Sequence, residues 1–347
     1  MLRGEAADEA RAGGWALPLG DGRAAFTACE IWRRSGDGIE RASLPVGELE
    51  AWARQAGEAL AAALEQRLGL LNEPAALPAG LPERGPLIMG VVNVTPDSFS
   101  DGGRFLDPAR ATAEGHAQHA AGADIVDVGG ESTRPGAADV SAEEEIRRVV
   151  PVIEGLARSG ILVSIDTRKA SVMQAAIAAG AGMINDVSAL RHDPDGLQVA
   201  GASGLPVVLM HSQGEPATMQ RDPSYACALL DVFDHLEQRI EAWMDAGFER
   251  RRLLIDPGIG FGKTVAHNLA ILRGLGLYLG LGSPLLLGVS RKSFIARLAG
   301  DGSDAAGRLP GSLAAALAGL AQGVAVLRVH DVAATRQALR IWQALGS

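Results

Sequence analysis

The chain has few aromatic residues and few cysteines. Aromatic residues make up only 4% of the 347 residues, and the two cysteines, Cys29 and Cys227, lie far apart and form no C-x-x-C pair. Two ordinary thiols in a reduced, cytoplasmic setting are therefore expected. The apolar fraction is nevertheless 47%. Alanine, glycine, valine and leucine dominate the composition, which suits helices packed closely on a buried parallel sheet.

Long apolar runs and an excess of basic residues are also missing. The most apolar late stretch, Leu313 to Leu327, is interrupted by Gln322 and is too short to span a membrane. It predicts a helix that runs into a strand. The N-terminus carries Glu5, Asp8 and Glu9 without an apolar run, so no secretory signal is expected. The net charge of −9 argues against general nucleic-acid binding but allows a local basic pocket for a phosphate.

The first 85 residues differ in pattern from the rest. A weak alternation runs from Ala24 to Arg33, and the stretch from Val46 to Leu71 predicts a helix. The Pro- and Gly-rich segment from Asn72 to Pro82 is typical of a linker. We therefore expect residues 1–85 to form a small α+β appendage of unknown role with its linker, and residues 86–347 to form the main domain.

From residue 86 onward, eight short apolar runs alternate with helical patterns. Continuous apolar runs are typical of strands buried on both faces, and eight β-then-α units in about 260 residues predict a (β/α)₈ (TIM) barrel. A doubly wound sheet is the alternative, although it normally has fewer strands and no Gly-x-Gly-x-x-Gly follows the first run. The runs are Leu87–Val92, Asp124–Val128, Ile161–Ile165, Met183–Val187, Pro206–Met210, Leu253–Ile255, Pro284–Val289 and Val324–Val329.

Two of the helical patterns are long. They run from Ser141 to Ser159 and from Tyr225 to Ala246. Ser141 followed by Glu144 predicts a capping box at the start of the first.

Every apolar run ends in polar or charged residues. In a parallel barrel the carboxyl ends of all strands meet at one rim, where active sites are built. Residues from the whole main domain are therefore expected to converge on one pocket. They are Asn93, Asp127 to Glu131, Asp166, Asn185 with Asp186, His211, Asp256, Ser290 to Lys292, and Arg328 with His330.

These residues have structural as well as functional interpretations. Asp186 alone can be a helix cap, and His211 can be a satisfied polar residue after a buried strand. Asp166, Asn185 and Asp256 together offer acceptors and an amide that fit the donor–acceptor edge of a heterocycle such as a pterin.

Basic residues follow the seventh and eighth runs, where barrels often bind phosphate. Lys292, Arg328 and His330 are the candidates, because a guanidinium fork and a compact ammonium both suit phosphate oxygens. Solvated charges at a loop edge are the alternative. Two polar loops, Asn93 to Gly103 and Gly129 to Gly136, are candidate mobile lids or ordinary surface loops.

Seven strings in the main domain resemble the successive motifs of bacterial dihydropteroate synthases, in the same order. The resemblance covers about three quarters of the chain, from Pro86 to the C-terminus, and the strings together are highly specific. They are MGVVNVTPDSFSDGG, DVGGESTRPGA, IDTRK, INDVSAL, LIDPGIGFGK, GVSRKSFIARL and RVHDV.

The resemblance implies a set of site residues. It implies condensation of a pterin diphosphate with p-aminobenzoate by an SN1-like displacement, with Mg²⁺ as cofactor, no general base and a homodimeric assembly. Asp101, Lys292, Arg328 and His330 are the implied catalytic residues. The implied pterin ligands are Asp166, Asn185, Asp256 and Lys292. The diphosphate ligands are Asn93, Arg328 and His330, with Asn93 also at the metal. The p-aminobenzoate side comprises Phe99, Thr133, Arg134, Pro135, Phe261 and Ser293.

At the level of sequence there are two alternative functions and three departures from the family pattern. A methyltetrahydrofolate methyltransferase shares the pterin carboxylates but needs no diphosphate site, and a degenerate pterin binder would keep the barrel without catalysis. Ser212 stands where the family often has a larger apolar residue, and Ile259 where it often has Phe. The appendage is absent from the shorter members of the family.

Overall fold

The chain forms two compact units. The computed structural model describes residues 2–19, 24–36, 38–73, 75–95, 108–132, 139–214 and 218–346. One unit, the appendage unit, comprises Met1–Ala76 with Tyr278–Gly282 and Gln343–Ser347, and the other, the barrel unit, comprises Leu77–Leu277 and Ser283–Trp342. The barrel unit thus begins inside the Pro- and Gly-rich segment.

The barrel unit contains a closed parallel barrel. Its strands are hydrogen-bonded in the order β10-β11-β12-β13-β6-β7-β8-β9, and β9 pairs with β10 to complete the ring. The strands are β6 (Leu87–Asn93), β7 (Ile125–Gly129), β8 (Val163–Asp166), β9 (Met183–Asp186), β10 (Val207–Met210), β11 (Leu253–Asp256), β12 (Leu285–Leu287) and β13 (Val324–Val329). All eight predicted runs are therefore confirmed as strands, and ring closure excludes the doubly wound alternative.

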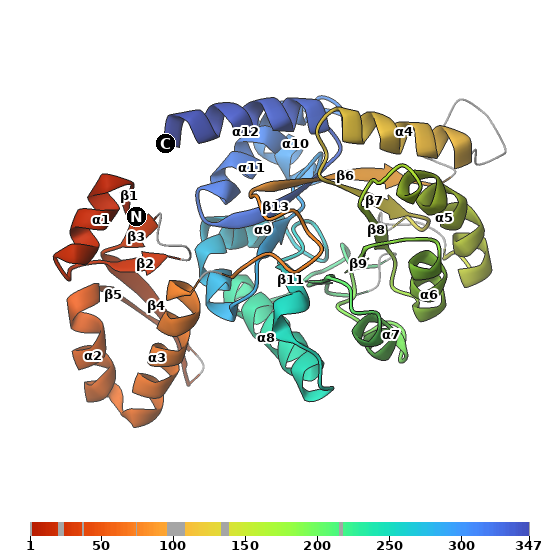
Figure 1. Ribbon diagram of the computed structural model, residues 1–347. Coiled ribbons are helices and arrows are strands. Elements are labelled where there is room, and N and C mark those ends of the chain that lie inside the picture. Colours follow the sequence, from red (N-terminus) through yellow and green to blue (C-terminus); the bar gives the residue numbers. More distant parts are fainter. Residues whose placement is uncertain are drawn as a thin grey trace. The chain divides into compact units, whose positions relative to one another are not determined.

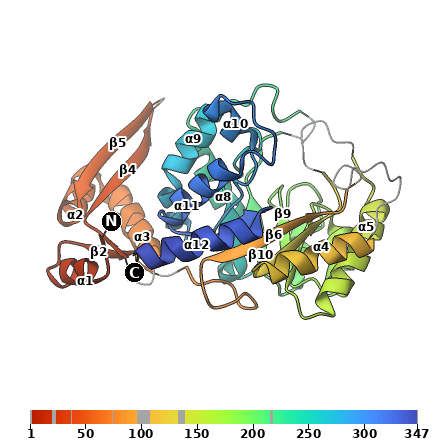
Figure 2. The same ribbon diagram turned by 90° about the horizontal axis from the view of Figure 1, so that it is seen from above.

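Helices follow the strands and lie on the outside of the ring (Figures 1 and 2). They are α4 (Pro108–Ala120), α5 (Ala142–Ala157), α6 (Ala170–Ala178), α7 (Gly196–Ala202), α8 (Ala228–Asp245), α9 (Val265–Arg273), α10 (Ser293–Ala299), α11 (Leu309–Leu320) and α12 (Val332–Gly346), with short 3₁₀ segments η3 (Arg250–Arg252) and η4 (Leu275–Leu281). Among the described residues, none of the helices combines the length and the apolar character needed to cross a bilayer.

The two long helices and the apolar late stretch appear where the sequence predicts them. At the start of α5, the Ser141 hydroxyl accepts a hydrogen bond from the Glu144 N–H at 3.2 Å. Glu144 does not complete the capping box, since its carboxylate binds Arg147 and Arg148 instead. Of the two hydrogen bonds of a capping box, only the one to the Ser141 hydroxyl is therefore present.

The inner face of the barrel is apolar at one level and polar at the next. Side chains along a strand alternate between its two faces, so residues two positions apart share a face. Ile125, Met183, Leu254 and Val326 belong to one fully buried core cluster, which Leu81 joins from the segment before β6. Two residues further along the same four strands stand Asp127, Asn185, Asp256 and Arg328. The strand period thus sets four polar side chains directly above the core.

The appendage unit is α+β. Its strands form a three-stranded sheet in the order β1-β3-β2 and a separate hairpin of β4 with β5. The predicted single helix from Val46 to Leu71 is wrong in one respect, because it is broken at Gly57, whose φ of 118° no helix allows. The elements are β1 (Leu2–Arg3), α1 (Glu5–Ala12), β2 (Leu17–Leu19), β3 (Ala24–Phe26), β4 (Ala28–Ser35), β5 (Gly38–Pro45), η1 (Val46–Glu48), α2 (Leu49–Ala56) and α3 (Glu58–Asn72).

Candidate active site at the strand ends

Arg328 is the centre of a hydrogen-bonded polar cluster above the core. Its Nε donates to Oδ2 of Asp127, and one terminal nitrogen donates to Oδ2 of Asp166, both at 2.7 Å. The Asn185 amide donates to the same Asp127 oxygen at 3.1 Å. The cluster joins β7, β8, β9 and β13, which parallel pairing brings to one rim although up to 201 positions separate the bonded residues in the sequence.

Burial and neighbouring charges set the protonation of this cluster. Burial raises the pKa of Asp166 to about 7, and the nearby Asp127 charge adds to the effect, while Arg328 opposes it. The pKa of Arg328 is raised because Asp127 and Asp166 outweigh the desolvation of its charge. The guanidinium therefore stays charged, while Asp166 can change its protonation near neutral pH.

Asp256 and Lys292 form the second charged part of the rim. The Asp256 carboxylate accepts a hydrogen bond from the Gly258 N–H at 2.7 Å, and burial raises its pKa. Burial and the Arg328 charge lower the pKa of Lys292 to about 8, although Asp256 and Asp166 favour its charged form. The Lys292 ammonium lies 4.1 Å from the centre of the Phe261 ring, a distance that allows a cation–π interaction.

The buried side chain of Lys263 anchors the loop between β11 and α9 through hydrogen bonds to its backbone. The Lys263 ammonium contacts Nδ1 of His211 at 2.8 Å and donates to the carbonyl oxygens of Gly258 and Phe261 at 2.9 and 3.1 Å. Burial lowers the pKa of Lys263 to about 7. A Cβ atom on Gly258, whose φ is +67°, would lie 1.8 Å from the His211 carbonyl oxygen. Only glycine fits this approach, which places Phe261 beside Lys292.

The basic residues after β12 and β13 are held by neighbouring side chains. The His330 backbone N–H donates to the Ser290 hydroxyl at 3.2 Å, and its Nδ1 lies 3.1 Å from the same oxygen. Burial, together with the charge of Arg328, lowers the pKa of His330 to about 3. Arg291 binds the Asp331 carboxylate through two nitrogens. His330 is thus a neutral imidazole at physiological pH, able to donate one N–H.

Two rim residues have structural roles. The Asp186 carboxylate accepts hydrogen bonds from the backbone N–H groups of Ser188 and Leu190 and so stabilises the turn after β9. The predicted helix cap is wrong, because the next helix begins only at Gly196. His211 is 5% exposed and its ring faces Lys263 and His235. Burial beside the Lys263 charge lowers its pKa, so it stays neutral.

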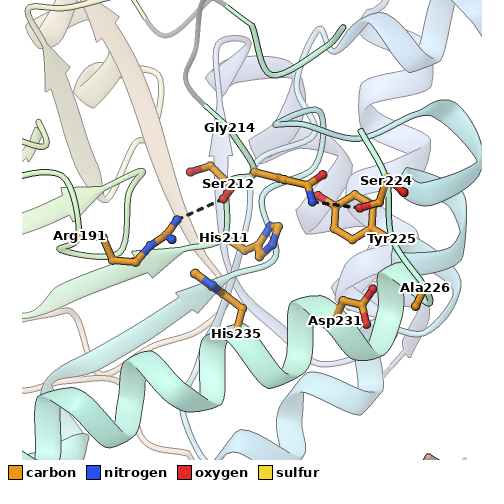
Figure 3. A pocket seen from close by; sticks show the side chains of 10 residues that line it. Arg191, His211, Ser212, Gly214, Ser224, Tyr225, Ala226, Asp231 and His235 are labelled. Atoms are coloured by element: carbon orange, nitrogen blue, oxygen red, sulfur yellow. Dashed lines mark hydrogen bonds between the residues drawn. The ribbon is translucent and has the colours of Figure 1, made fainter. Parts of the chain in front are cut away.

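A hollow of about 340 Å³ adjoins His211 on the side of α8. In Figure 3, Arg191 and Tyr225 lie on opposite sides of the His211 ring, with His235 projecting from α8. Burial lowers the pKa of His235 to about 4. Ser212 lines this hollow, but the rim carboxylates Asp166 and Asp256 do not. The charged cluster at the strand ends is therefore the better candidate for chemistry.

The remaining predicted site residues fall into two groups. Asn93 ends β6 and is paired with Gly129, Phe261 is half-buried, and Ser293 begins α10 as an exposed residue. Five predictions lie outside the described residues: Phe99, Asp101, Thr133, Arg134 and Pro135. The structure thus brings Asp166, Asn185, Arg328, Asp256 and Lys292 to one rim.

Sequence reasoning gave no role to three groups that support the rim. The sequence predicts Asp127 only as a strand-end residue, and Lys263 appears only within a motif. The third group is Glu131, which is 7% exposed in its side chain and binds both Arg168 and Lys169. A charge inside an apolar strand, as at Asp127, is the sequence signal that points to such residues.

Comparison with known proteins identifies the family. The model of the family described as "Pterin binding enzyme" matches residues 89–330. Dihydropteroate synthase of Escherichia coli (strain K12) is 45% identical over 260 residues, which cover 75% of this chain and 91% of that protein. The chain belongs to the pterin-binding enzymes, among the dihydropteroate synthases. The dihydropteroate synthase of Neisseria meningitidis serogroup B is 48% identical over 267 residues, or 75% of this chain and 93% of the relative.

Solved structures of this family share the barrel. Dihydropteroate synthase of Xanthomonas albilineans with 4-aminobenzoic acid has a TM-score of 0.71 at 50% identity and covers 75% of this chain and 93% of its own. A second structure of that enzyme, in complex with 7,8-dihydropteroate, has a TM-score of 0.68 at 46% identity over 75% and 94% of the two chains. The Yersinia pestis enzyme with a sulfonamide drug reaches 0.73 at 43% identity over 77% and 98%.

Proposed function

We propose that the chain is a dihydropteroate synthase that condenses 6-hydroxymethyl-7,8-dihydropterin diphosphate with p-aminobenzoate, giving 7,8-dihydropteroate and pyrophosphate. The observation that carries the proposal is the rim cluster, in which hydrogen bonds and nearby charges link Arg328, Asp127, Asp166, Asn185, Asp256 and Lys292 at the strand ends. Buried acceptors, an amide and two cations at one rim match a substrate that combines a polar heterocycle with a diphosphate.

The pterin ring is assigned to the acceptors. The pterin edge carries amino and ring N–H donors and a carbonyl acceptor. Ionised Asp166 and Asp256 accept from the donors, while Asn185 and Lys292 donate to acceptor atoms. Because these groups are buried, each hydrogen bond forms in a low-dielectric site and discriminates strongly against rings that lack a partner atom.

The diphosphate is assigned to Arg328, His330 and Asn93. The charged guanidinium and the neutral imidazole N–H stabilise negative charge that develops on the leaving oxygen. In the described residues no group of three or more His, Cys, Asp or Glu side chains is arranged to hold a metal ion. A single amide oxygen at Asn93 suits Mg²⁺ that arrives on the diphosphate, since Mg²⁺ commonly binds substrate phosphates with few protein ligands. When bound, Mg²⁺ would supply further charge neutralisation.

The displacement needs positioning rather than a general base. The bond from the pterin CH₂ to the diphosphate oxygen breaks with its electron pair on oxygen, and the electron-rich ring shares the positive charge left on carbon. The weakly basic amine of p-aminobenzoate then forms the C–N bond and loses a proton to solvent. Phe261 and Ser293 are assigned to the p-aminobenzoate side. The assignments of Phe99, Asp101, Thr133, Arg134 and Pro135 rest on the family resemblance alone.

The test is turnover with both products measured. The purified chain is incubated with pterin diphosphate, p-aminobenzoate and Mg²⁺, and pyrophosphate and dihydropteroate are quantified together. Equal amounts of both products, lost by about 100-fold or more in Lys292→Ala, are expected. Arg297→Ala, a change on the exposed end of α10, is the matched control. Pterin binding without either product would indicate a degenerate binder or a methyltransferase, and methyl transfer from methyltetrahydrofolate would distinguish the two.

We also propose a cytoplasmic homodimer. The two free cysteines support a reducing compartment, and the family resemblance supports the dimer. Sedimentation equilibrium of the full chain tests the assembly, and a monomer at micromolar concentration would contradict it.

A further inference from the structure

Asp127 is the most buried member of the rim cluster. Its side chain is 0% exposed, against 12% for Asp166 and 20% for Arg328. One oxygen, Oδ2, accepts from both the Arg328 Nε and the Asn185 amide. The other, Oδ1, is buried and has no hydrogen-bond partner among the described residues. A carboxylate this deep ties two other side chains together and is less accessible than Asp166.

Arg328 is hydrogen-bonded to two carboxylates, Asp127 and Asp166, that differ in how exposed they are to solvent. Asp166 is the partly exposed one, and it binds the guanidinium through a terminal nitrogen. Asp127 accepts from Nε, which lies closer to the arginine backbone than the terminal nitrogens do. This hydrogen bond fixes the plane of the guanidinium group. If a ligand drew Asp166 away, the Asp127 bond alone would still define where the guanidinium points.

We infer that Asp127 is a positioning residue that holds Arg328 and Asn185 in their ligand-binding orientations, so that Asp166 is free to turn from the arginine to the donor edge of the pterin. The inference rests on the proposed function, since it assumes that Asp166 receives a pterin ring. Asp127 touches no substrate atom and acts only through its two partners.

The charge of Asp127 gives the inference a distinct readout. A negative charge beside Asp166 disfavours ionisation of that carboxyl and keeps its pKa high. Removing the charge also leaves Arg328 to act on Asp166 alone, which lowers the Asp166 pKa further. Both effects have the same sign. The charged groups around Asp166 are Arg328 from β13, Lys292 before α10, Asp127 from β7, Asp186 from β9 and Glu145 from α5.

The experiment compares Asp127→Asn with Asp124→Asn in the full chain. Asp124 is a matched control, because it precedes the same strand at its opposite end, is 1% exposed in its side chain, and is also shared by two arginines, Arg84 and Arg336. Binding of pterin diphosphate and the pH dependence of kcat/KM are measured for both variants and the unchanged chain, and circular dichroism reports folding.

Asp127→Asn is expected to weaken pterin diphosphate binding about 10- to 100-fold, the usual effect of losing a partner that orients a ligand-binding side chain. The acid limb of its kcat/KM profile should move to lower pH. Asp124→Asn should lose stability but keep the affinity and the limb of the unchanged chain. Unchanged affinity and an unmoved limb in folded Asp127→Asn would overturn the inference.

A second variant covers the case in which Asp127→Asn does not fold. Asp127→Glu keeps the charge but displaces the acceptor, so it should weaken pterin binding while leaving the acid limb in place. Unchanged affinity in this variant would overturn the inference. Failure of the unchanged chain to bind pterin diphosphate would overturn the proposed function, and this inference with it.

Discussion

At the scale of single residues, burial moves the pKa values of Asp166 and Lys292 toward neutral pH. The pKa of Asp166 is raised to about 7 and that of Lys292 is lowered to about 8, because desolvation disfavours both charged forms. The two groups lie in one cluster and favour each other's charged form, which limits both shifts. Each group therefore titrates within the range in which an enzyme of this kind is assayed.

These two values predict a narrow bell-shaped pH profile for kcat/KM. Below about pH 7, Asp166 gains a proton and no longer accepts as a carboxylate, so activity falls as pH falls. Above about pH 8, Lys292 loses its proton and its charge, so activity falls as pH rises. Lys292→Arg, which stays charged, should lower the rate but remove the basic limb below pH 9. A basic limb unchanged in this variant would assign it to another group.

Replacement of Lys263 by Met is expected to destabilise the barrel unit by about 2–4 kcal/mol. The change leaves the carbonyl oxygens of Gly258 and Phe261 buried without their donor. The KM for p-aminobenzoate should rise as well, because the loop that carries Phe261 loses its anchor. Urea unfolding and steady-state kinetics measure the two effects. Arg158→Met, on an exposed i,i+4 pair with Glu154, should change stability by less than about 0.5 kcal/mol.

At the scale of elements, the loop after β11 is built by close backbone approach. Gly258, Gly260 and Gly262 all have positive φ angles, and a Cβ on Gly262 would lie 2.3 Å from the Gln213 carbonyl oxygen. The loop therefore packs directly on the segment after β10. This packing brings the Phe261 ring to Lys292. The backbone conformation of the glycines therefore determines where Phe261 lies at the rim.

Gly258→Ala is expected to lower the free energy of unfolding by more than about 3 kcal/mol, because both the clash with His211 and the positive φ oppose it. Gly276→Ala is the control, since a Cβ there meets nothing within 4 Å. Thermal unfolding of both variants measures the difference. Equal melting temperatures would mean that the loop can move away from β10 without loss of stability.

At the scale of the whole molecule, the rim and the appendage belong to different compact units. All the described rim residues lie in the barrel unit. The Escherichia coli relative aligns with 75% of this chain and over 91% of its own length. The family model likewise matches residues 89–330, which lie in the barrel unit apart from Tyr278–Gly282.

Deletion of residues 1–76 is therefore expected to leave kcat and both KM values within about twofold, provided that the barrel stays folded. Loss of stability is allowed, because two later segments belong to the appendage unit and lose their neighbours. Kinetics and circular dichroism of the truncated chain test this. A folded barrel with kcat lowered more than tenfold would assign the appendage a part in catalysis.

The sequence by itself determined the eight strands and the residues at their ends. Continuous apolar runs are typical of strands buried on both faces, and the two-residue period places Asp127, Asn185, Asp256 and Arg328 on the face that carries the core. It also determined the family, through motifs along the barrel. The sequence does not predict the helix break at Gly57, since one glycine in a helical pattern does not reveal its φ angle.

Only the tertiary structure decided how the rim residues share their charges. The bonds from Arg328 to Asp127 and Asp166 join residues 201 and 162 positions apart, and no local pattern encodes such a pairing. The raised pKa of Asp166 and the lowered pKa of Lys292 likewise depend on burial and on neighbours that ring closure supplies. The residue types and the two-residue strand period determine which side chains lie at the rim. Their electrostatic interactions and their desolvation arise only when the strands have closed into a barrel.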